Sequence, residues 1–190
     1  MKILLGTTNK VKIREIKKIF SLNNIQLVSL EDEIDIPDVD EDGTTFEENS
    51  VKKALEIAKH TGMITIADDS GICVEALNGA PGIYSARYAG TPKNEKKNIE
   101  KLISKLQGVK NRKAKFISVI TLAKPTGETY SFTGEILGEI IDIPRGKGYA
   151  YDPYFLIKNI NKTLAELPID TSYSSRTRAV RKLEKKLSNL

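Results

Sequence analysis

The sequence of 190 residues has very few of the side chains on which many enzymes and metalloproteins depend. Its single cysteine, Cys73, excludes an internal disulfide bond and a zinc site built from several thiolates. Its single histidine, His60, leaves no His-rich metal site and little scope for a histidine-based catalytic triad. Chemistry must therefore be carried by carboxylates, lysines, hydroxyls and backbone amides, and a metal ion would be a hard cation such as Mg²⁺ bound by oxygen.

Long hydrophobic runs are also missing. No apolar stretch approaches the about 18 residues that a membrane-spanning helix requires, and the apolar start at residues 1–5 is too short for a signal peptide because Gly6 follows at once. With 39% hydrophobic and 29% charged residues, no repeats and no linker rich in Pro, Gly or Ser, the chain is typical of a soluble globular protein. We therefore expect a single domain over residues 1–190, a cytoplasmic location and no membrane partner.

The formal net charge of +5 hides an uneven distribution. Residues 31–51 contain ten acidic and no basic side chains, whereas residues 93–115 contain nine basic against two acidic ones, and residues 176–190 contain six against one. This division suits a polyanionic substrate that arrives with a divalent cation, although a solvated helix face is the simpler interpretation of residues 93–115. We expect no stable nucleic-acid partner, because the basic segments lack interleaved aromatic residues.

Hydrophobic periodicity predicts an α/β protein with a mixed β-sheet. Short apolar runs predict strands at residues 2–5, 25–30, 64–67, 115–123, 129–132, 135–141 and 154–157. Amphipathic spacing and capping residues predict helices from residue 8 or 9 to 20, from 45 to near 62, from 94 to 106, and from 174 or 175 towards the C-terminus.

Four polar segments are candidates for chemistry. The first, residues 6–12, leaves a predicted strand and opens a predicted helix. Unpaired amides at a helix N-terminus and the charges of Lys10 and Lys12 would stabilise phosphate oxygens there. The spacing is not that of a Walker loop, and an ordinary helix cap by Thr8 or Asn9 is the alternative.

The second segment is Asp68-Asp69-Ser70-Gly71, which we predict at the end of the strand at residues 64–67. Adjacent carboxylates repel one another unless a cation or a proton neutralises one of them. Together with the acidic cluster at residues 38–42, the pair predicts an Mg²⁺ site in which one carboxylate orients or deprotonates water. Capping of a turn by Asp69 and Ser70 is the alternative.

The third segment, residues 144–153, combines two cations with Tyr149 and Tyr151, on which a planar base could stack, and with Asp152, which could accept hydrogen bonds from a base. The fourth, residues 173–178, places arginines at the start of the last helix, where they could reach a base or a phosphate. A structured turn and a solvated helix cap are the respective alternatives.

Taken together, these segments resemble the inosine and xanthosine triphosphate pyrophosphatase family, enzymes that remove deaminated purine nucleotides. The resemblance covers nearly the whole chain, and its matching stretches are Thr8 to Lys12, Thr45 to Ala54, Ala67 to Gly71, Gly79 to Gly90 and Gly148 to Phe155. It implies an elongated, two-lobed α/β fold around a long mixed β-sheet, with a nucleotide cleft between the lobes, and commonly a homodimer. It also implies hydrolysis of ITP, dITP or XTP to the monophosphate and pyrophosphate, with Mg²⁺ as cofactor.

The resemblance further implies roles for individual residues. Asp69 is expected to accept a proton from the attacking water, and Glu41 and Asp69 are expected to bind Mg²⁺. The adjacent Asp68 leaves open which carboxylate of the pair acts. Substrate binding is expected from residues that would contact both ends of a nucleotide: Thr7, Thr8, Asn9, Lys10, Lys12, Lys53, Ser70, Tyr149, Ala150, Tyr151, Asp152, Ser175 and Arg176. Tyr149 stands where the family usually has a stacking phenylalanine.

The chain departs from the family just before its last helix. The family usually has a lysine followed by Ser-His-Arg, whereas residues 168–176 are shorter, contain no lysine and end in Ser175-Arg176. The loss of those base-reading side chains predicts relaxed selectivity between 6-oxo purine nucleotides and ATP or GTP. Ala150 replaces a glycine, which predicts strain if its φ is positive. Two alternatives stay open: a pyrophosphatase of other modified nucleotides, and a nucleotide- or nucleic-acid-binding protein without catalysis.

Overall fold

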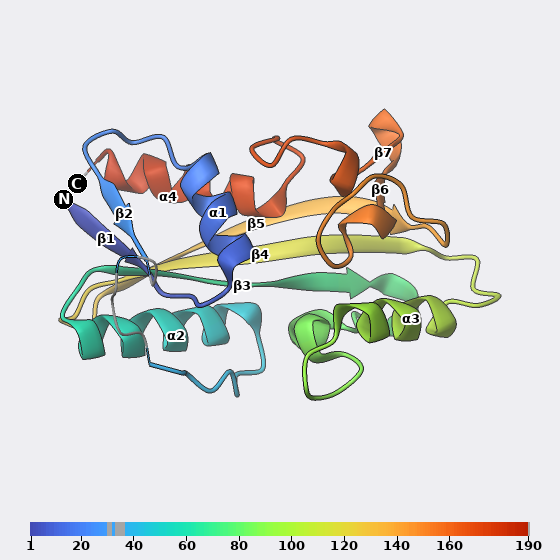
Figure 1. Ribbon diagram of the computed structural model, residues 1–190, viewed down its shortest axis with the longest axis horizontal. Coiled ribbons are helices and arrows are strands. Elements are labelled where there is room, and N and C mark those ends of the chain that lie inside the picture. Colours follow the sequence, from blue (N-terminus) through green and yellow to red (C-terminus); the bar gives the residue numbers. More distant parts are fainter. Residues whose placement is uncertain (30–31, 33–36, 190) are drawn as a thin grey trace.

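Figure 1 shows the computed structural model, which describes residues 1–29, 32 and 37–189. One long β-sheet runs through the protein. Within these residues, seven strands lie side by side in the order β2-β1-β3-β4-β5-β6-β7. Their bounds are Lys2–Leu5 for β1, Gln26–Val28 for β2, Thr65–Val74 for β3, Lys113–Ala123 for β4, Thr129–Ile140 for β5, Phe155–Ile157 for β6 and Lys162–Thr163 for β7. β1 pairs in parallel with β2 and β3, and the later pairs are antiparallel. The predicted α/β class with a mixed sheet is therefore confirmed.

Four α-helices cover the sheet in the described part of the chain: α1 (Lys10–Ile19), α2 (Phe46–Thr61), α3 (Glu95–Lys105) and α4 (Ser175–Leu187). Each follows a polar residue whose side-chain oxygen accepts a hydrogen bond from a backbone N–H of the first turn; these residues are Asn9, Thr45, Asn94 and Ser174. These caps explain why the helix starts could be predicted. Among the described residues, none of the helices combines the length and the apolar character needed to cross a membrane.

The chain leaves β1 towards one side of the sheet and later returns to its other side, which makes β1 a topological switch point. β1 leads through α1 to β2 on one side, and β2 leads through α2 to β3 on the other side of β1. α1 packs with α4 on one face of the sheet, whereas α2 packs against β3 and β4 on the opposite face (Figure 1). In open α/β sheets, ligands bind in the crevice beyond the carboxyl ends of the strands at such a switch point. A ligand cleft is therefore expected beyond Leu5, the last residue of β1.

The two largest hydrophobic clusters of the described residues lie along the sheet. One joins α1 and α4 to β1 and to one end of β3 and β4, and it includes Ile66 and Leu122. The other joins α3 and β6 to the opposite ends of the long strands, and it includes Ile72 and Phe155. β3 contributes to both clusters, so the polar residues near its middle lie between two separately packed regions.

The strand predicted at residues 64–67 is wrong at its C-terminal end. β3 continues through the segment Asp68 to Gly71 and on to Val74, because it pairs with β4 along its whole length. Asp, Ser and Gly have low strand propensity, but pairing with a neighbouring strand overrides it. The strands predicted at residues 129–132 and 135–141 form one strand, β5. The strand predicted at 25–30 covers only Gln26–Val28, and residue 30 and most of the acidic stretch at 31–36 lie outside the described residues.

Candidate active site

A cleft of about 470 Å³, a size typical of small-molecule sites, lies beyond the end of β1. β1 covers the edge of β3 only as far as Ile66, where the amide of Gly6 donates to the Ile66 carbonyl at 2.8 Å. Beyond that point, Asp69, Ser70 and Gly71 line the cleft. The other walls come from the β1–α1 loop, α1, α2, the loop before β6 and the segment before α4.

The cleft brings together most of the residues predicted from the sequence. Its lining includes Thr7, Thr8, Asn9, Lys12, Glu41, Lys53, Asp69, Ser70, Tyr149, Ala150, Tyr151, Asp152, Ser175 and Arg176. Lys10 is exposed and is not part of the lining, so its position gives no support to a role in substrate binding. The reason is geometric: Lys10 and Lys12 are two residues apart in α1, and residues at that spacing do not share a helix face.

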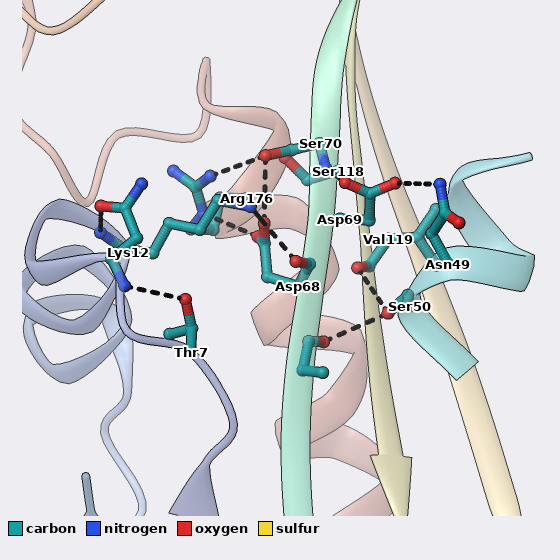
Figure 2. Close-up of polar contacts among 12 residues, drawn as sticks. Thr7, Lys12, Asn49, Ser50, Asp68, Asp69, Ser70, Ser118, Val119 and Arg176 are labelled. Carbon is teal, nitrogen blue, oxygen red and sulfur yellow. Dashed lines mark hydrogen bonds and ion pairs between the residues drawn. The ribbon is translucent and has the colours of Figure 1, made fainter. Parts of the chain in front are cut away.

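The β1–α1 loop is held by an ordinary helix cap. Asn9 Oδ1 accepts hydrogen bonds from the amides of Val11 (2.9 Å) and Lys12 (3.2 Å), and Thr7 Oγ1 accepts one from the Asn9 amide at 3.2 Å. The simple cap considered as an alternative therefore describes Asn9 correctly. Lys12, however, extends across to β3, so a full positive charge lies beside the N-terminus of α1 (Figure 2). A helix N-terminus next to a lysine is a favourable place for phosphate oxygens.

Asp68 and Asp69 point to opposite sides of β3, because successive side chains of a strand alternate (Figure 2). Asp68 lies on the side of α1 and α4, and its side chain is 0% exposed. Its Oδ1 lies 2.5 Å from Lys12 Nζ, and its Oδ2 lies 2.8 Å from Arg176 Nε. Burial acts to raise the pKa of Asp68, but Arg176 and Lys12 hold it well below its usual range. The counter-ions of Asp68 are therefore cations of the protein, Lys12 and Arg176.

Asp69 lies on the side of α2 and is 5% exposed. Its Oδ2 accepts a hydrogen bond from Asn49 Nδ2 at 3.2 Å, and its Oδ1 accepts one from the Ser70 amide at 3.0 Å. Burial raises the pKa of Asp69, and the charges of Lys12 and Lys53 offset only part of this effect. Because Asp69 lines the cleft and its contacts are amide hydrogen bonds rather than ion pairs, it is the carboxylate of the pair that is suited to accept a proton.

Glu41 faces the cleft from the loop before α2. Lys53 Nζ lies 2.5 Å from Glu41 Oε1 and Arg87 Nη1 lies 3.6 Å from Oε2, while Arg87 Nη2 donates to the Glu41 carbonyl at 3.2 Å. Partial burial acts to raise the pKa of Glu41, but Lys53 outweighs it and the pKa is lowered. The neighbouring Asp42 is exposed and instead pairs with Lys52 at 2.8 Å. Two cations therefore hold Glu41 at the cleft.

Glu41 and Asp69 are two of the carboxylates that line the cleft, beside Glu15, Asp38, Glu95 and Asp152, and carboxylate oxygens have the right chemistry for a hard metal ion. Mg²⁺ commonly takes one or two protein carboxylates and completes its coordination with water and substrate phosphates. The charge of Glu41 contributes to the raised pKa of Asp69, so the two carboxylates interact electrostatically. No group of three or more His, Cys, Asp or Glu side chains arranged to hold a metal occurs in the described residues. Two carboxylates at the cleft fit an Mg²⁺ ion whose remaining ligands are water and substrate phosphates.

The loop before β6 forms the other end of the cleft. Tyr149 is 39% exposed, which leaves its ring free to stack on a base. Tyr151 is buried instead, and its hydroxyl donates to the Ser85 carbonyl at 2.8 Å, so its position favours a structural role over stacking. Ala150 has a φ of +49°, and the strain predicted for a residue other than glycine at this position is therefore present.

Arg176 and Asp152 both line the cleft and interact electrostatically. Arg176 Nε donates to Asp68, Nη1 forms an ion pair with Glu15, and Nη2 donates to Ser70 Oγ at 3.0 Å. All three guanidinium nitrogens are thus engaged, which fixes the side chain. Burial raises the pKa of Asp152 to about 7, Glu15 adds to the rise, and Arg176 opposes it.

Ser175 is the predicted substrate-binding residue next to Arg176. It is 6% exposed, and its Oγ lies 2.9 Å from Ser118 Oγ of β4. α4 comes this close to the sheet because Gly134 of β5 has no side chain, and a Cβ there would lie 1.9 Å from the Ser175 carbonyl oxygen. Ser175 therefore offers the cleft no ionisable group.

Glu15, Asn49 and Ser118 are among the residues at the site that were not predicted from the sequence. Glu15 follows Lys12 by three residues on α1, so helical spacing could have placed it at the cleft. Asn49 lies in the first turn of α2, and no local signal shows that this turn faces Asp69. Ser118 contacts Ser175 across a long separation in sequence, which no local pattern reports.

The geometry agrees with the chain's similarity to known proteins. The sequence model of the Ham1 family matches residues 3–186. A dITP/XTP pyrophosphatase from Geobacter sulfurreducens is 46% identical over 184 residues, which cover 94% of this chain and 92% of that protein. A dITP/XTP pyrophosphatase from an Exiguobacterium species is 45% identical over 187 residues, which cover 97% and 95%. Among solved structures, the Ham1 protein of Staphylococcus aureus matches with a TM-score of 0.88 and 41% identity, covering 100% of this chain and 99% of that chain.

Proposed function

Since the chain belongs to the Ham1 family, we propose that it is an Mg²⁺-dependent pyrophosphatase that hydrolyses ITP, dITP and XTP to the monophosphate and pyrophosphate. The activity for which its relatives are named supports the proposal. The observation that carries it is the meeting, in one cleft, of a helix N-terminus beside Lys12, the buried carboxylate of Asp69 and the exposed ring of Tyr149. These groups match the three parts of the reaction: phosphate binding, proton transfer and base binding.

The phosphate end of the cleft supplies positive charge. Lys12, Lys53 and the N-terminus of α1 lie along one part of its lining. When water attacks the α-phosphorus, negative charge grows on the nonbridging oxygens and on the leaving pyrophosphate. Cations and amides that are already in position stabilise this charge more in the transition state than in the ground state, and so they accelerate the reaction.

Asp69 acts as the proton acceptor. The water oxygen bonds to the α-phosphorus, the bond between that phosphorus and the bridging oxygen of the pyrophosphate breaks, and the water proton passes to the Asp69 carboxylate. Burial raises the pKa of Asp69, which makes its carboxylate a stronger base than an exposed aspartate. Hydrogen bonds from Asn49 and from the Ser70 amide fix the orientation of that carboxylate.

Glu41 and Asp69 would hold the Mg²⁺ ion. When bound, the ion supplies Lewis-acid stabilisation of phosphate charge. Lys53 and Arg87 keep Glu41 ionised and turned to the cleft, as an oxygen ligand must be. The electrostatic interaction between Glu41 and Asp69 supports this assignment, because a cation would relieve their repulsion.

Relaxed base selectivity is the second candidate function. It is favoured by the side chain of Ser175, which is a buried hydroxyl hydrogen-bonded to Ser118. This position therefore has no ionisable side chain that could recognise a 6-oxo group. Without a donor of that kind, rejection of ATP and GTP relies on weaker contacts. We expect the preference for ITP over ATP in kcat/KM to be below about 100-fold.

The direct test is a panel of triphosphates. Purified protein with Mg²⁺ is mixed with ITP, dITP, XTP, ATP, GTP and a modified pyrimidine triphosphate, and pyrophosphate release is measured with Asp69→Asn as the control. Release from the 6-oxo purines and loss of release in the variant support the proposal. If no triphosphate yields pyrophosphate, the protein binds nucleotides without catalysis. Highest activity on the modified pyrimidine selects the other pyrophosphatase alternative.

The family resemblance also leads us to propose a homodimer that acts in the cytoplasm without a stable nucleic-acid partner. Size-exclusion chromatography with light scattering should give twice the chain mass of 21.1 kDa. Titration with fluorescent DNA and RNA at physiological salt should show no saturable binding. A monomeric mass, or tight binding of either polymer, would contradict these points.

A further inference from the structure

Asp68 is a buried charged group that the proposed reaction does not use. Its side chain is 0% exposed and is not part of the cleft lining, so it does not touch a substrate in the cleft. It nevertheless contacts two cations that do line the cleft, Lys12 and Arg176. Any contribution of Asp68 to the site must therefore pass through those two side chains.

Asp68 holds these cations from two different helices (Figure 2). Lys12 Nζ of α1 lies 2.5 Å from Asp68 Oδ1 and donates to the Asp68 carbonyl at 3.2 Å. Arg176 Nε of α4 donates to Asp68 Oδ2 at 2.8 Å. The Ser70 hydroxyl donates to Asp68 Oδ1 at 3.0 Å and accepts from Arg176 Nη2 at 3.0 Å. The bonds among Asp68, Ser70 and Arg176 form a closed ring between β3 and α4, and Lys12 ties α1 to the same carboxylate.

The charge of Asp68 offsets repulsion among the cations around it. Burial lowers the pKa of Lys12, and the nearby charges of Lys53 and Arg176 lower it further. Asp68 opposes all three effects. Arg176 has a second carboxylate partner in Glu15, whereas Lys12 forms its ion pair with Asp68. Asp68 is therefore the ion-pair partner that holds Lys12 in position.

We propose that Asp68 is a positioning residue that couples two cations of the cleft lining, Lys12 and Arg176. A change in the Arg176 side chain should then alter phosphate binding through the position of Lys12. The proposal rests on the proposed function in one respect, the assignment of Lys12 to phosphates. It goes beyond that function by linking two side chains of the cleft energetically through a residue that is not part of its lining.

Inorganic tripolyphosphate is the probe, because it has phosphates but no nucleoside. Isothermal titration calorimetry of the full chain without metal ions measures its Kd. For Asp68→Asn we expect the Kd to rise about tenfold, because Lys12 loses a charged hydrogen-bond partner. Loss of a negative charge would by itself tighten the binding of an anion, so the direction of the change identifies positioning. An unchanged or lower Kd would overturn the proposal.

Arg176→Lys tests the coupling even where Asp68→Asn does not fold. The variant keeps the positive charge but loses the planar fork that contacts Asp68, Glu15 and Ser70 at once. We expect the Kd for tripolyphosphate to rise about threefold, as for residues coupled within one polar network. A Kd equal to that of the wild type would mean that the position of Lys12 does not depend on Arg176, and the coupling would be refuted.

Glu184→Gln is the matched control. Glu184 is also a buried carboxylate, with a side chain 8% exposed, but its contacts are Arg181 and Ser21 outside the cleft. We expect its melting temperature to fall and its Kd for tripolyphosphate to stay unchanged. Equal weakening in this control would mean that general destabilisation explains the losses and would overturn the proposal. Pyrophosphate release by the wild type does not enter this titration, so a failure of the proposed function is seen separately.

Discussion

Asp68 and Asp69 are neighbours of the same residue type with opposite surroundings. Asp68 is enclosed by Lys12 and Arg176 on the side of α1 and α4, and its pKa is well below the usual range. Asp69 faces α2, accepts hydrogen bonds from amides, and has a raised pKa because of burial. The alternation of one strand is sufficient to make this difference.

The comparison shows that two adjacent carboxylates need not form one site. On one face of β3, the negative charge of Asp68 is balanced by two cations of the protein. On the other face, Asp69 forms no such ion pair, and its raised pKa favours binding of a proton or a cation. Stability is therefore expected to depend on the first residue, and chemistry on the second.

The largest expected effect separates the two residues by activity. Asp69→Asn should lower kcat for ITP hydrolysis by about 1,000-fold, because the proton acceptor is lost. Its melting temperature should stay close to that of the wild type, because a neutral amide costs less to bury than a carboxylate. Pyrophosphate release and thermal unfolding measure the two effects. Retention of more than a tenth of the wild-type kcat would remove Asp69 from this role.

Stability should separate the two residues in the opposite sense. Asp68→Asn leaves Lys12 and Arg176 buried without their shared counter-ion, which should cost about 3 kcal/mol of unfolding free energy. Urea denaturation of both variants gives the comparison. If Asp69→Asn loses as much unfolding free energy as Asp68→Asn, the expected difference between the two residues is contradicted.

Substitutions of two glycines test the packing on the Asp68 face and on the Asp69 face of the sheet. A Cβ on Gly134 would lie 1.9 Å from the Ser175 carbonyl oxygen, and a Cβ on Gly71 would lie 2.5 Å from the Gly82 carbonyl oxygen. Gly134→Ala should displace the start of α4 and cost about 2 kcal/mol or more, because backbone must move. Gly71→Ala should cost somewhat less and disturb the Asp69 face. Urea denaturation of the two variants ranks their losses of unfolding free energy. If both variants bind tripolyphosphate with the same Kd, Arg176 of α4 does not help to position the phosphate-binding Lys12.

The dependence of stability on pH should differ in sign between the two residues. Because the folded pKa of Asp68 is lowered, its stabilising contribution is present above the unfolded pKa of about 3.9 and is lost as pH falls below it. Because the folded pKa of Asp69 is raised, the wild type loses stability relative to Asp69→Asn as pH rises from about 4 through the folded pKa. Denaturation from pH 3 to pH 8 without Mg²⁺ measures both differences. If the two contributions to the unfolding free energy change with pH in the same direction, the surroundings assigned to Asp68 and Asp69 are contradicted.

The smallest expected effect lies outside both faces. Ala150 has a φ of +49°, and glycine adopts this conformation without a steric penalty. Ala150→Gly should therefore stabilise the protein by about 1 kcal/mol while leaving the contrast between Asp68 and Asp69 intact. Thermal unfolding provides the measurement. Destabilisation would show that the methyl group contributes packing that exceeds its strain.

Local signals predicted the helices and the location of the candidate site. Asn9, Thr45 and Ser174 cap their helices as their sequence contexts indicate, because a cap depends on neighbours within four residues. The segment at residues 6–12 and the Tyr149 loop likewise reach the cleft.

The division between Asp68 and Asp69 could not be predicted in this way. It depends on the continuation of β3 past residue 67, which results from pairing with the distant β4. The partners of Arg176 come from α1 and β3, more than 100 residues earlier in the chain. Pairwise contacts at that separation leave no periodic pattern in a single sequence.

The position of bond cleavage tests the account most directly. ITP is hydrolysed by the wild-type protein with Mg²⁺ in water enriched in ¹⁸O, and the products are analysed by mass spectrometry. Attack of water at the α-phosphorus predicts one ¹⁸O atom in IMP and none in pyrophosphate. Label in pyrophosphate, or release of inorganic phosphate with IDP, would contradict the arrangement of Asp69 and the phosphate-binding cations that is argued here.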